Sequence, residues 1–324
     1  MNNGKAVLVE GLHKNFGEIY AVQGVDFAVA TGEIFSLLGP NGAGKSTTIS
    51  MLSCLLRPTQ GDASVMGFSI TKEAQRVKEV IGVVPQDIAL FPDLSARENL
   101  DFWGKMYGLR GAKLRERVDE VLEMVGLADH ARGRIERFSG GMKRRINIGA
   151  ALLHHPQVLI LDEPTVGIDP QSRRSILDGV KAFNRQGMTV LYTSHYMEEV
   201  AELSDHIAIM DHGKLIAYGT HAELIKTVGE LDRLDLAING PAQAVADSWK
   251  SVAGVHSVSV RENADETSLA DSPVITVLVE DSNLVLPDLF DAARQLQARI
   301  TSVDIQEPNL EAVFINLTGR ALRD

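Results

Sequence analysis

The feature that most constrains the fold of this chain is a glycine-rich stretch between an apolar run and a helical pattern. It fits the phosphate-binding pattern G-x-x-x-x-G-K-[ST]. Residues 33–38 before it indicate a buried strand, and residues 45–56 after it carry apolar side chains at helical spacing. A glycine-rich turn that binds nothing is the alternative, and this strand–loop–helix context weighs against it. The stretch consists of Gly39, Pro40, Asn41, Gly42, Ala43, Gly44, Lys45, Ser46 and Thr47.

Each part of this phosphate loop (residues 39–47) has a chemical role in that context. Glycines let successive backbone N–H groups point at the phosphates of a nucleotide, and the helix N-terminus adds a partial positive charge. Lys45 would bring a full positive charge to the outer phosphates, and the Ser46 hydroxyl would bind Mg²⁺. The sequence therefore predicts a binding site for a nucleoside triphosphate with magnesium.

Length and composition limit what else the chain can be. Its 324 residues leave room for one large and one small domain. The formal net charge of −11, without a basic block, argues against nucleic acid as a partner. The single cysteine, Cys54, excludes an internal disulfide and a cysteine-based zinc site, which fits a reducing cytoplasm. No apolar run approaches the roughly 20 residues of a membrane helix, and residues 1–5 lack a signal-peptide core, so we expect a soluble, cytoplasmic chain.

Short strands surround the phosphate loop in the sequence. Phe16 and Tyr20 lie just upstream of it, where one of them could stack on an adenine ring or both could belong to the core. Gln86 directly follows a short strand, and a lone glutamine there is a weak signal that usually marks an ordinary loop residue. We expect strands over residues 6–10, 22–29, 63–66 and 81–85.

The chain then becomes charged and helical over residues 93–137, which indicates a helical insert in an α/β domain. Ser95 and Glu98 have the spacing of a capping box at a helix start. After the insert, Ser139 with Gly140 and Gly141 opens another predicted helix. Exposed N–H groups and a hydroxyl at such a start can bind an anion, although alone this arrangement is usually an ordinary cap.

Two acids and a histidine end later apolar runs. Asp162 and Glu163 follow residues 158–161, and parallel strands deliver such residues to the edge of a sheet where ligands bind. Asp162 suits a role in holding Mg²⁺, and Glu163 suits the acceptor that orients and deprotonates an attacking water. A strand that merely ends in surface acids is the alternative, which a nearby phosphate loop disfavours. His195 ends the run at 189–194 and could contact a terminal phosphate, although a core histidine would otherwise be commoner.

In this order, the motifs resemble those of the ATP-binding cassette (ABC) family over about residues 4–220. The resemblance implies an α/β fold, with a RecA-like P-loop core, an antiparallel β subdomain and a helical subdomain. It identifies Gln86 as the residue that contacts Mg²⁺ or water and senses a membrane partner. It identifies Asp169 as the acid of the loop after the catalytic strand, and His195 as the histidine that contacts the γ-phosphate.

The same resemblance assigns the helix start at Ser139, Gly140 and Gly141 to the signature motif, which contacts the nucleotide held by the opposite subunit. Phe16 lies where the family places its adenine-stacking aromatic. Phe138 and Met142 replace the leucine and the glutamine of the usual signature, so Met142 is left out of the predicted site. Both departures resemble the branch that powers export of antibiotics, drugs, lipids, lipid-linked polymers or ions through separate membrane subunits. Within it, the sequence is most similar to ABC-2-type, daunorubicin-resistance-like proteins.

The tail beyond residue 220 is predicted to be a linker helix over 221–232 and an accessory domain over 233–324. Its pattern of strand, helix, strand, strand, helix and strand suits a small α+β, ferredoxin-like unit with a polar loop at 262–273. Its end at 311–324 resembles the C-terminal domain of the ATPases of drug-resistance exporters. We expect a dimerisation or regulatory platform rather than a ligand site.

The family resemblance also implies partners. A head-to-tail dimer, with a second copy or a paralogous ATPase, would hold two ATP molecules, and separate transmembrane permease subunits would bind it at the cytoplasmic face of the membrane. The permease would dock near Gln86, on Phe91, Pro92 and Leu94, unless these apolar residues belong to the core.

Two other functions remain open from the sequence. A soluble ABC-type ATPase acting on nucleic acid or ribosomes typically has a coiled-coil insertion, zinc cysteines or tandem cassettes, none of which this sequence has. A regulatory module that binds nucleotide without hydrolysing it is the third reading, which Glu163 and His195 disfavour. The sequence does not identify the transported cargo, and export rests on the resemblance.

Overall fold

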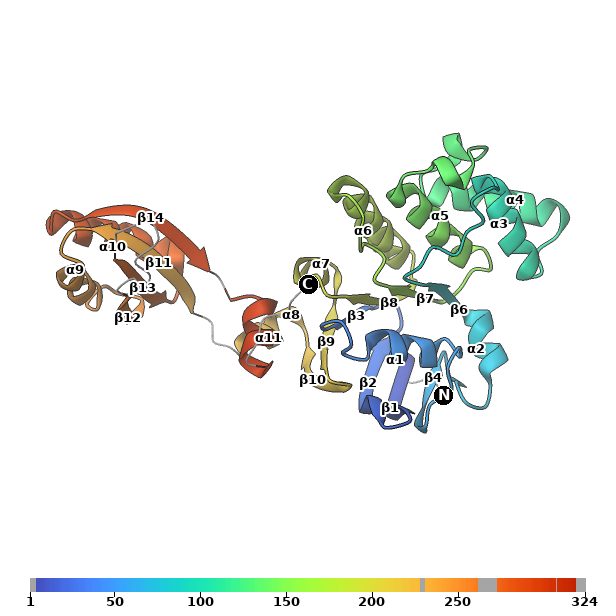
Figure 1. Ribbon diagram of the computed structural model, residues 1–324, viewed down its shortest axis with the longest axis horizontal. Helices are drawn as coiled ribbons and strands as arrows, with labels where there is room; N and C mark the ends of the chain where they lie inside the picture. The colour runs from blue at the N-terminus through green and yellow to red at the C-terminus, as the bar shows by residue number, and fades with distance from the viewer. Residues whose placement is uncertain (1–3, 228–230, 262–272, 307, 319–324) are drawn as a thin grey trace. The chain divides into compact units, whose positions relative to one another are not determined.

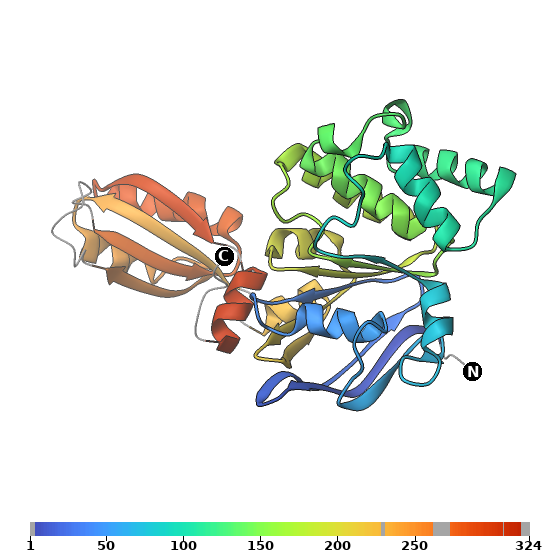
Figure 2. The ribbon, with the colours of Figure 1, turned by 45° about the vertical axis from the view of Figure 1, so that its right-hand side comes forward.

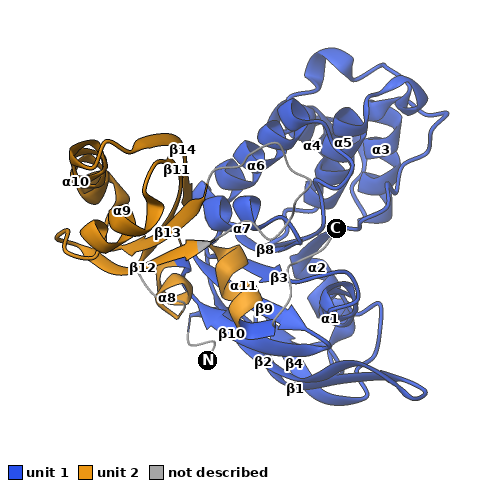
Figure 3. Cartoon of the chain, turned by 60° about the vertical axis from the view of Figure 1, so that its left-hand side comes forward, with its two compact units in different colours: residues 1–221, 317–324 blue, residues 222–316 orange. Residues whose placement is uncertain are grey.

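The computed structural model describes residues 4–227, 231–261, 273–306 and 308–318 (Figures 1 and 2). The chain divides into two compact units, residues 1–221 with 317–324 and residues 222–316 (Figure 3). Within the described ranges, no helix is long and apolar enough to cross a membrane.

A six-stranded sheet forms the centre of the first unit, in the order β10-β9-β3-β8-β7-β6. Every strand pair in it is parallel except the pair of β9 with the edge strand β10. The three central strands are buried along their whole length, which explains why they are nearly continuous apolar runs. The strands are β3 (Ile34–Leu38), β6 (Ile81–Val84), β7 (Val158–Asp162), β8 (Thr189–Ser194), β9 (His206–Asp211) and β10 (Lys214–Gly219).

An antiparallel sheet in the order β2-β1-β4-β5 covers one side of this central sheet. One apolar core joins the two sheets and helix α1, with Leu12, Phe35, Leu52 and Ile160 among its fully or nearly fully buried members. The elements are β1 (Lys5–Phe16), β2 (Ile19–Ala30), α1 (Lys45–Leu52), β4 (Gln60–Val65), β5 (Phe68–Ser69) and α2 (Ala74–Val80). This arrangement is the predicted P-loop core with its antiparallel β subdomain.

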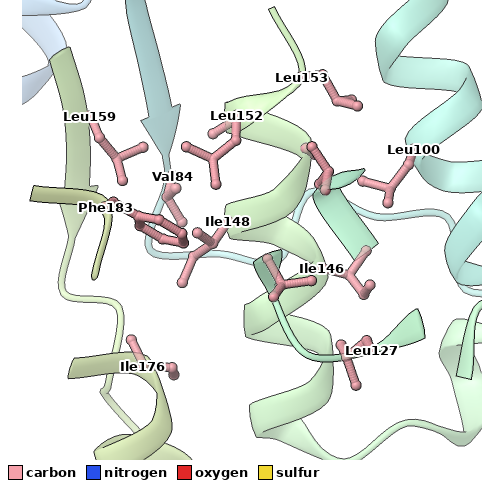
Figure 4. Packing of buried hydrophobic residues seen from close by; sticks show 14 of the residues in the cluster. Val84, Leu100, Leu127, Ile146, Ile148, Leu152, Leu153, Leu159, Ile176 and Phe183 are labelled. Carbon is pink, nitrogen blue, oxygen red and sulfur yellow. The ribbon is translucent and has the colours of Figure 1, made fainter. Parts of the chain in front are cut away.

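Helices gather on the opposite side of the central sheet, as predicted for the helical subdomain (Figure 1). A second apolar core joins them to β6 and β7, and Leu100, Ile148, Leu159 and Ile176 belong to it (Figure 4). The predicted capping box is confirmed at the start of α3: Glu98 N–H donates to Ser95 Oγ at 3.2 Å, and Ser95 N–H donates to Glu98 Oε2 at 2.8 Å. The α-helices are α3 (Ala96–Met106), α4 (Gly111–Met124), α5 (Gly140–Leu152), α6 (Pro170–Arg185) and α7 (Met197–Leu203), with 3₁₀ turns at Ala128–His130 and Ile135–Arg137.

The second unit contains a four-stranded antiparallel sheet in the order β12-β13-β11-β14. This is the strand order of a β-α-β-β-α-β unit in which each helix connects two strands across an intervening one. Its core includes Leu236, Trp249, Val277 and Leu289. The polar loop expected at 262–273 lies outside the described residues except for its last one. The elements are α8 (His221–Lys226), β11 (Asp232–Asn239), α9 (Ala242–Trp249), β12 (Val255–Arg261), β13 (Val274–Val279), α10 (Ser282–Gln295), β14 (Arg299–Gln306) and α11 (Leu310–Thr318).

The linker helix is shorter than the one predicted over residues 221–232. Helix α8 ends at Lys226, because Thr227 donates both its N–H and its Oγ1–H to Leu224 O, at 3.1 and 2.6 Å. Asp232 already belongs to β11, where it pairs with Val279 of β13.

Candidate functional site

A pocket of about 560 Å³ opens along the phosphate loop. Parts of the chain far apart in sequence border it: the start of β2, the phosphate loop with the first turn of α1, Gln86 after β6, and Glu163 after β7. Its lining residues are Ile19, Tyr20, Ala21, Gln23, Asn41, Gly42, Ala43, Gly44, Lys45, Ser46, Thr47, Gln86, Glu163 and His212. Seven of the nine residues of the phosphate loop therefore line one cavity.

The backbone of the phosphate loop requires its glycines. Gly42 and Gly44 adopt φ angles of +81° and +104°, which side-chain-bearing residues rarely adopt. A Cβ on Gly44 would lie 2.6 Å from Ala21 O, and one on Gly39 would lie 2.3 Å from Met210 O. Helix α1 begins after Gly44 without a side-chain cap and without an acid in its first turn. Its N-terminal N–H groups and partial positive charge therefore suit an anion in the pocket.

Lys45 is the buried cation of the site, with 4% of its side chain exposed. Its Nζ donates to Gly39 O at 2.7 Å and to Pro40 O at 3.2 Å, which holds the side chain against the phosphate loop. The same Nζ lies 3.0 Å from Glu163 Oε1 and forms a buried ion pair with it. Each group compensates the other's charge, so removing either one would leave an uncompensated buried charge.

Asp162 lies at the C-terminal end of β7, next to the first turn of α1. Its Oδ1 accepts hydrogen bonds from Ser46 Oγ at 3.2 Å and from Thr193 Oγ1 at 2.6 Å. A carboxylate beside a serine hydroxyl offers the oxygen ligands that Mg²⁺ prefers. These side chains therefore fit a magnesium ion that is also bound by the phosphates of a nucleotide.

Glu163 is the residue around which the predicted catalytic side chains gather. Its Oε2 accepts a hydrogen bond from Gln86 Nε2 at 3.4 Å and lies 3.4 Å from His195 Nδ1, without hydrogen-bond geometry. Its backbone has a φ of +44°, a strained conformation for a residue with a side chain, and its N–H donates to Thr193 Oγ1 at 2.9 Å. Lys45, Gln86 and His195 therefore all surround the carboxylate of Glu163, so the four predicted catalytic residues form one group.

Sequence reasoning missed Thr193. Its hydroxyl donates to Asp162 and accepts from the backbone of Glu163, so it fixes both acids of the site. The register of the parallel sheet pairs Asp162 with Thr193. The sequence did contain a signal for it: Thr193 is a hydroxyl residue near the end of a predicted strand. Neighbouring parallel strands end at the same edge of the sheet, so this hydroxyl could have been expected near Asp162 and Glu163.

The predicted signature residues lie at the start of α5, outside the phosphate-loop pocket. Ser139 caps that helix by accepting from Met142 N–H at 3.2 Å. A Cβ on Gly141 would lie 2.2 Å from Cβ and Oγ of Ser172, whereas a Cβ on Gly140 would lie no nearer than 3.4 Å to Ile168. Gly141 is therefore needed where α5 packs closely against the start of α6.

Asp169 caps the neighbouring helix α6, just before Pro170. Its Oδ1 accepts from Ser172 N–H at 2.9 Å, and this hydrogen bond lowers the pKa of Asp169 below its ordinary value. Asp169 also lies outside the lining of the pocket. The signature and Asp169 thus form a second group of predicted residues, at the starts of two adjacent helices.

The aromatic and apolar residues predicted for stacking and docking are exposed. Phe16 and Tyr20 are 47% and 61% exposed, so the alternative that they belong to the core is wrong. Tyr20 lines the pocket, whereas Phe16 does not. Phe91 is 43% exposed and packs edge-on against Phe102, with ring centroids 4.7 Å apart, so it is not a core residue either. Pro92 is exposed and Leu94 is half-buried.

Comparison with known proteins agrees with the resemblance found in the sequence. The family model described as ABC transporter matches residues 22–166. The linearmycin resistance ATP-binding protein LnrL of Bacillus subtilis is 49% identical over 318 residues, which cover 97% of this chain and 99% of that protein. The daunorubicin resistance ATP-binding protein DrrA3 of Streptomyces coeruleorubidus is 37% identical over 314 residues, which cover 97% and 96%.

A solved structure matches about two thirds of the chain. The ATP-binding cassette MJ0796, in a dimeric post-hydrolysis state bound to ADP and Pi, has a TM-score of 0.60 and 28% sequence identity. The match covers 66% of this chain and 98% of that one. The pocket, the order of the motifs and the whole-length relatives agree, and the chain belongs to the ABC transporter family as an ATP-hydrolysing, ATP-binding protein.

Proposed function

We propose that this chain is the motor subunit of an exporter that removes an antibiotic or a similar drug-like compound through separate membrane subunits. The observation that carries this proposal is the 49% identity to a linearmycin resistance ATP-binding protein across nearly the whole of both chains. That likeness covers 97% of this chain, so it includes most of the second unit. The transported compound itself would pass through the partner.

We assign nucleotide binding to the phosphate loop, with ATP phosphates at the start of α1. Lys45 would exchange its 3.0 Å contact with Glu163 for the outer phosphates. Ser46 and Asp162, supported by Gln86, would hold Mg²⁺, which supplies charge neutralisation for the phosphates when bound. Phe16 or Tyr20 would stack on the adenine, and the lining of the pocket favours Tyr20.

Glu163 is the proposed general base for hydrolysis. Once Lys45 contacts the phosphates, the carboxylate of Glu163 would accept a proton from the attacking water. Gln86 and His195, each 3.4 Å from Oε2 of Glu163, are placed to orient that water and the terminal phosphate. These distances support a single catalytic group built from the ends of three strands and one loop.

The signature residues Ser139, Gly140 and Gly141, together with Asp169, would complete the site of a second copy. All four lie outside the pocket of their own chain, at the starts of helices whose N-terminal N–H groups suit phosphate. A head-to-tail dimer with two ATP molecules between the copies follows from this proposal. ATP would close the dimer and hydrolysis would open it.

The membrane partner would dock beside Gln86, at the cytoplasmic face of the membrane. Phe91, Pro92 and Phe102 form an exposed apolar surface on the segment that follows Gln86 and on α3. We expect Phe91→Asp to prevent binding of the partner, because burying a charge in an apolar contact is costly, while ATP binding stays unchanged. Unchanged partner binding by this variant would remove the surface from the proposal.

A pull-down from detergent-solubilised membranes of the source organism tests the proposed function. Tagged wild-type chain should copurify with a polytopic membrane protein in stoichiometric amount, and Phe91→Asp, as the matched control, should not. Copurification of ribosomal proteins or nucleic acid without a membrane protein would instead favour a soluble ATPase acting on those partners.

A further inference from the structure

A buried carboxylate outside the catalytic group lies between two of its loops. Glu199 of α7 is 3% exposed, although no proposed step of hydrolysis uses it. Its Oε2 accepts hydrogen bonds from three hydroxyls: Thr165 Oγ1 at 2.8 Å, Tyr192 OH at 2.7 Å and Ser194 Oγ at 3.2 Å. A buried charge with this many partners is costly to assemble, so its position calls for an explanation.

The three hydroxyls belong to segments on either side of the site. Thr165 lies in the loop between Glu163 and Asp169, whereas Ser194 directly precedes His195. Burial raises the pKa of Tyr192 well above its ordinary value, so its phenol stays protonated and remains a donor. One carboxylate oxygen therefore ties the loop after β7 to the end of β8.

A second connection leads from Glu199 to the imidazole of His195. Oε1 of Glu199 lies 3.4 Å from Nε of Arg173, at the start of α6. The Arg173 guanidinium lies 4.7 Å from the ring centroid of Tyr196, which lies 4.2 Å from the centroid of the His195 ring. In addition, Tyr196 N–H donates to Ser194 Oγ at 2.9 Å, so both the ring and the backbone of the histidine loop are held.

We infer that Glu199 is a positioning residue that couples the loop carrying Glu163 and Asp169 to the loop carrying His195. Through Thr165 it holds one loop, and through Ser194 and Arg173 it holds the other. A change at Asp169, which the proposed function places opposite a second copy, would thereby reach His195 of the same chain. This inference rests on the proposed roles of His195 and Asp169.

The charge of Glu199 is the property that matters. An ionised carboxylate accepts several hydrogen bonds and attracts a guanidinium, whereas the amide of glutamine has one acceptor oxygen and would direct an N–H group at one of its present donors. Glu199→Gln therefore keeps the size and shape of the side chain but disrupts its contacts with the three hydroxyls and with Arg173. Glu198 precedes it on the same helix and is exposed, so Glu198→Gln is a matched control with the same change of charge.

The test compares the steady-state ATPase activity of full-length Glu199→Gln, Glu198→Gln and wild type. We expect kcat of Glu199→Gln to fall about tenfold to a hundredfold, while KM for ATP changes less than about twofold. Glu198→Gln should match wild type. Tyr192→Phe removes a single donor and keeps the ring, so it should lower kcat by a smaller factor and provides the test if Glu199→Gln does not fold.

A double-mutant cycle with His195→Ala separates positioning from general damage. If Glu199 acts through His195, then Glu199→Gln causes no further loss of kcat in the His195→Ala background. An equal loss in both backgrounds, or a wild-type kcat for Glu199→Gln, would overturn the inference and leave the ATPase function intact. If His195→Ala itself keeps wild-type kcat, the proposed role of His195 fails, and the inference fails with it.

Discussion

The two groups of predicted residues in the first unit differ in what surrounds them. Lys45, Gln86 and His195 each have a nitrogen within 3.4 Å of the Glu163 carboxylate, and Lys45 and Glu163 are nearly fully buried. The signature, by contrast, begins with an exposed Ser139 whose hydroxyl accepts only from its own helix in the described contacts.

In the proposed function, these two groups are unlike halves of a site that two copies complete together. In the pocket half, opposite charges already compensate one another, so the half is assembled before any ligand binds. In the signature half, α5 starts with a serine cap and has no acid in its first turn, so an anion supplied from outside would complete it, whereas the start of α6 already carries the Asp169 carboxylate. Four substitutions test this contrast, from the largest expected effect to the smallest.

Lys45→Ala should have the largest effect. It removes the buried cation of the pocket and leaves the Glu163 carboxylate uncompensated, so ATP affinity should fall by about two orders of magnitude and turnover should be lost. Isothermal titration and phosphate release measure the two quantities. ATP binding close to the wild-type affinity would contradict the assignment of the phosphates to this pocket.

Glu163→Gln should separate turnover from binding. Loss of the general base should lower kcat by a factor of about 10²–10⁴. ATP should bind at least as tightly as to wild type, because Lys45 no longer has a carboxylate 3.0 Å away that competes with the phosphates. Size-exclusion chromatography with ATP should show the variant as a stable dimer. Equal ATPase rates for variant and wild type would exclude Glu163 from its role.

Gly141→Ala should destabilise the fold of the signature half, with Gly140→Ala as its matched control. The new methyl group at position 141 would overlap Ser172, which lies 2.2 Å away, so we expect a loss of about 1–3 kcal/mol in the free energy of unfolding. At position 140 the nearest atom is 3.4 Å away, so stability should hardly change. Urea unfolding measures both, and equal stabilities would contradict the close packing of α5 on α6.

Asp169→Asn should have the smallest effect, and that effect should depend on pH. The pKa of Asp169 is lowered in the folded chain, so its charge stabilises the fold above the pKa of a free aspartate, about 3.9. This contribution disappears as the pH falls through the lower, folded-state pKa. Asparagine can still cap the helix, so the difference in Tm between wild type and variant should be positive at pH 7 and should shrink as the pH falls below the pKa of a free aspartate, about 3.9. A constant difference would contradict this account.

Local patterns predicted most of the fold because the elements here follow local rules. The phosphate loop, the capping box at Ser95 and the buried strands ending at Asp162 each combine a spacing with a stop signal in neighbouring residues. The end of helix α8 could not be predicted from local patterns. Its end depends on Thr227 bonding back to Leu224, and the start of β11 depends on a pairing partner some 47 residues later, Val279.

The candidate site was predicted as a set of residues but not as a set of contacts. Nothing near Glu199 in the sequence indicates that its side chain bonds Thr165, because that partner lies in the loop after β7, 34 residues away. The strained φ of Glu163 and the exposure of Phe16 likewise depend on the whole fold. The sequence shows which residues follow each strand at the edge of the central sheet, whereas the packing of the whole fold determines which of their side chains are in contact.

Mixing two inactive variants tests the two-half account most directly. Lys45→Ala disables the pocket half and Ser139→Arg disables the signature half, so neither variant alone can form a complete site. In an equal mixture, half of the randomly paired dimers would combine one intact pocket with one intact signature, which restores about a quarter of the wild-type ATPase rate. A mixture no more active than its separate components would contradict the claim that the two halves meet between copies.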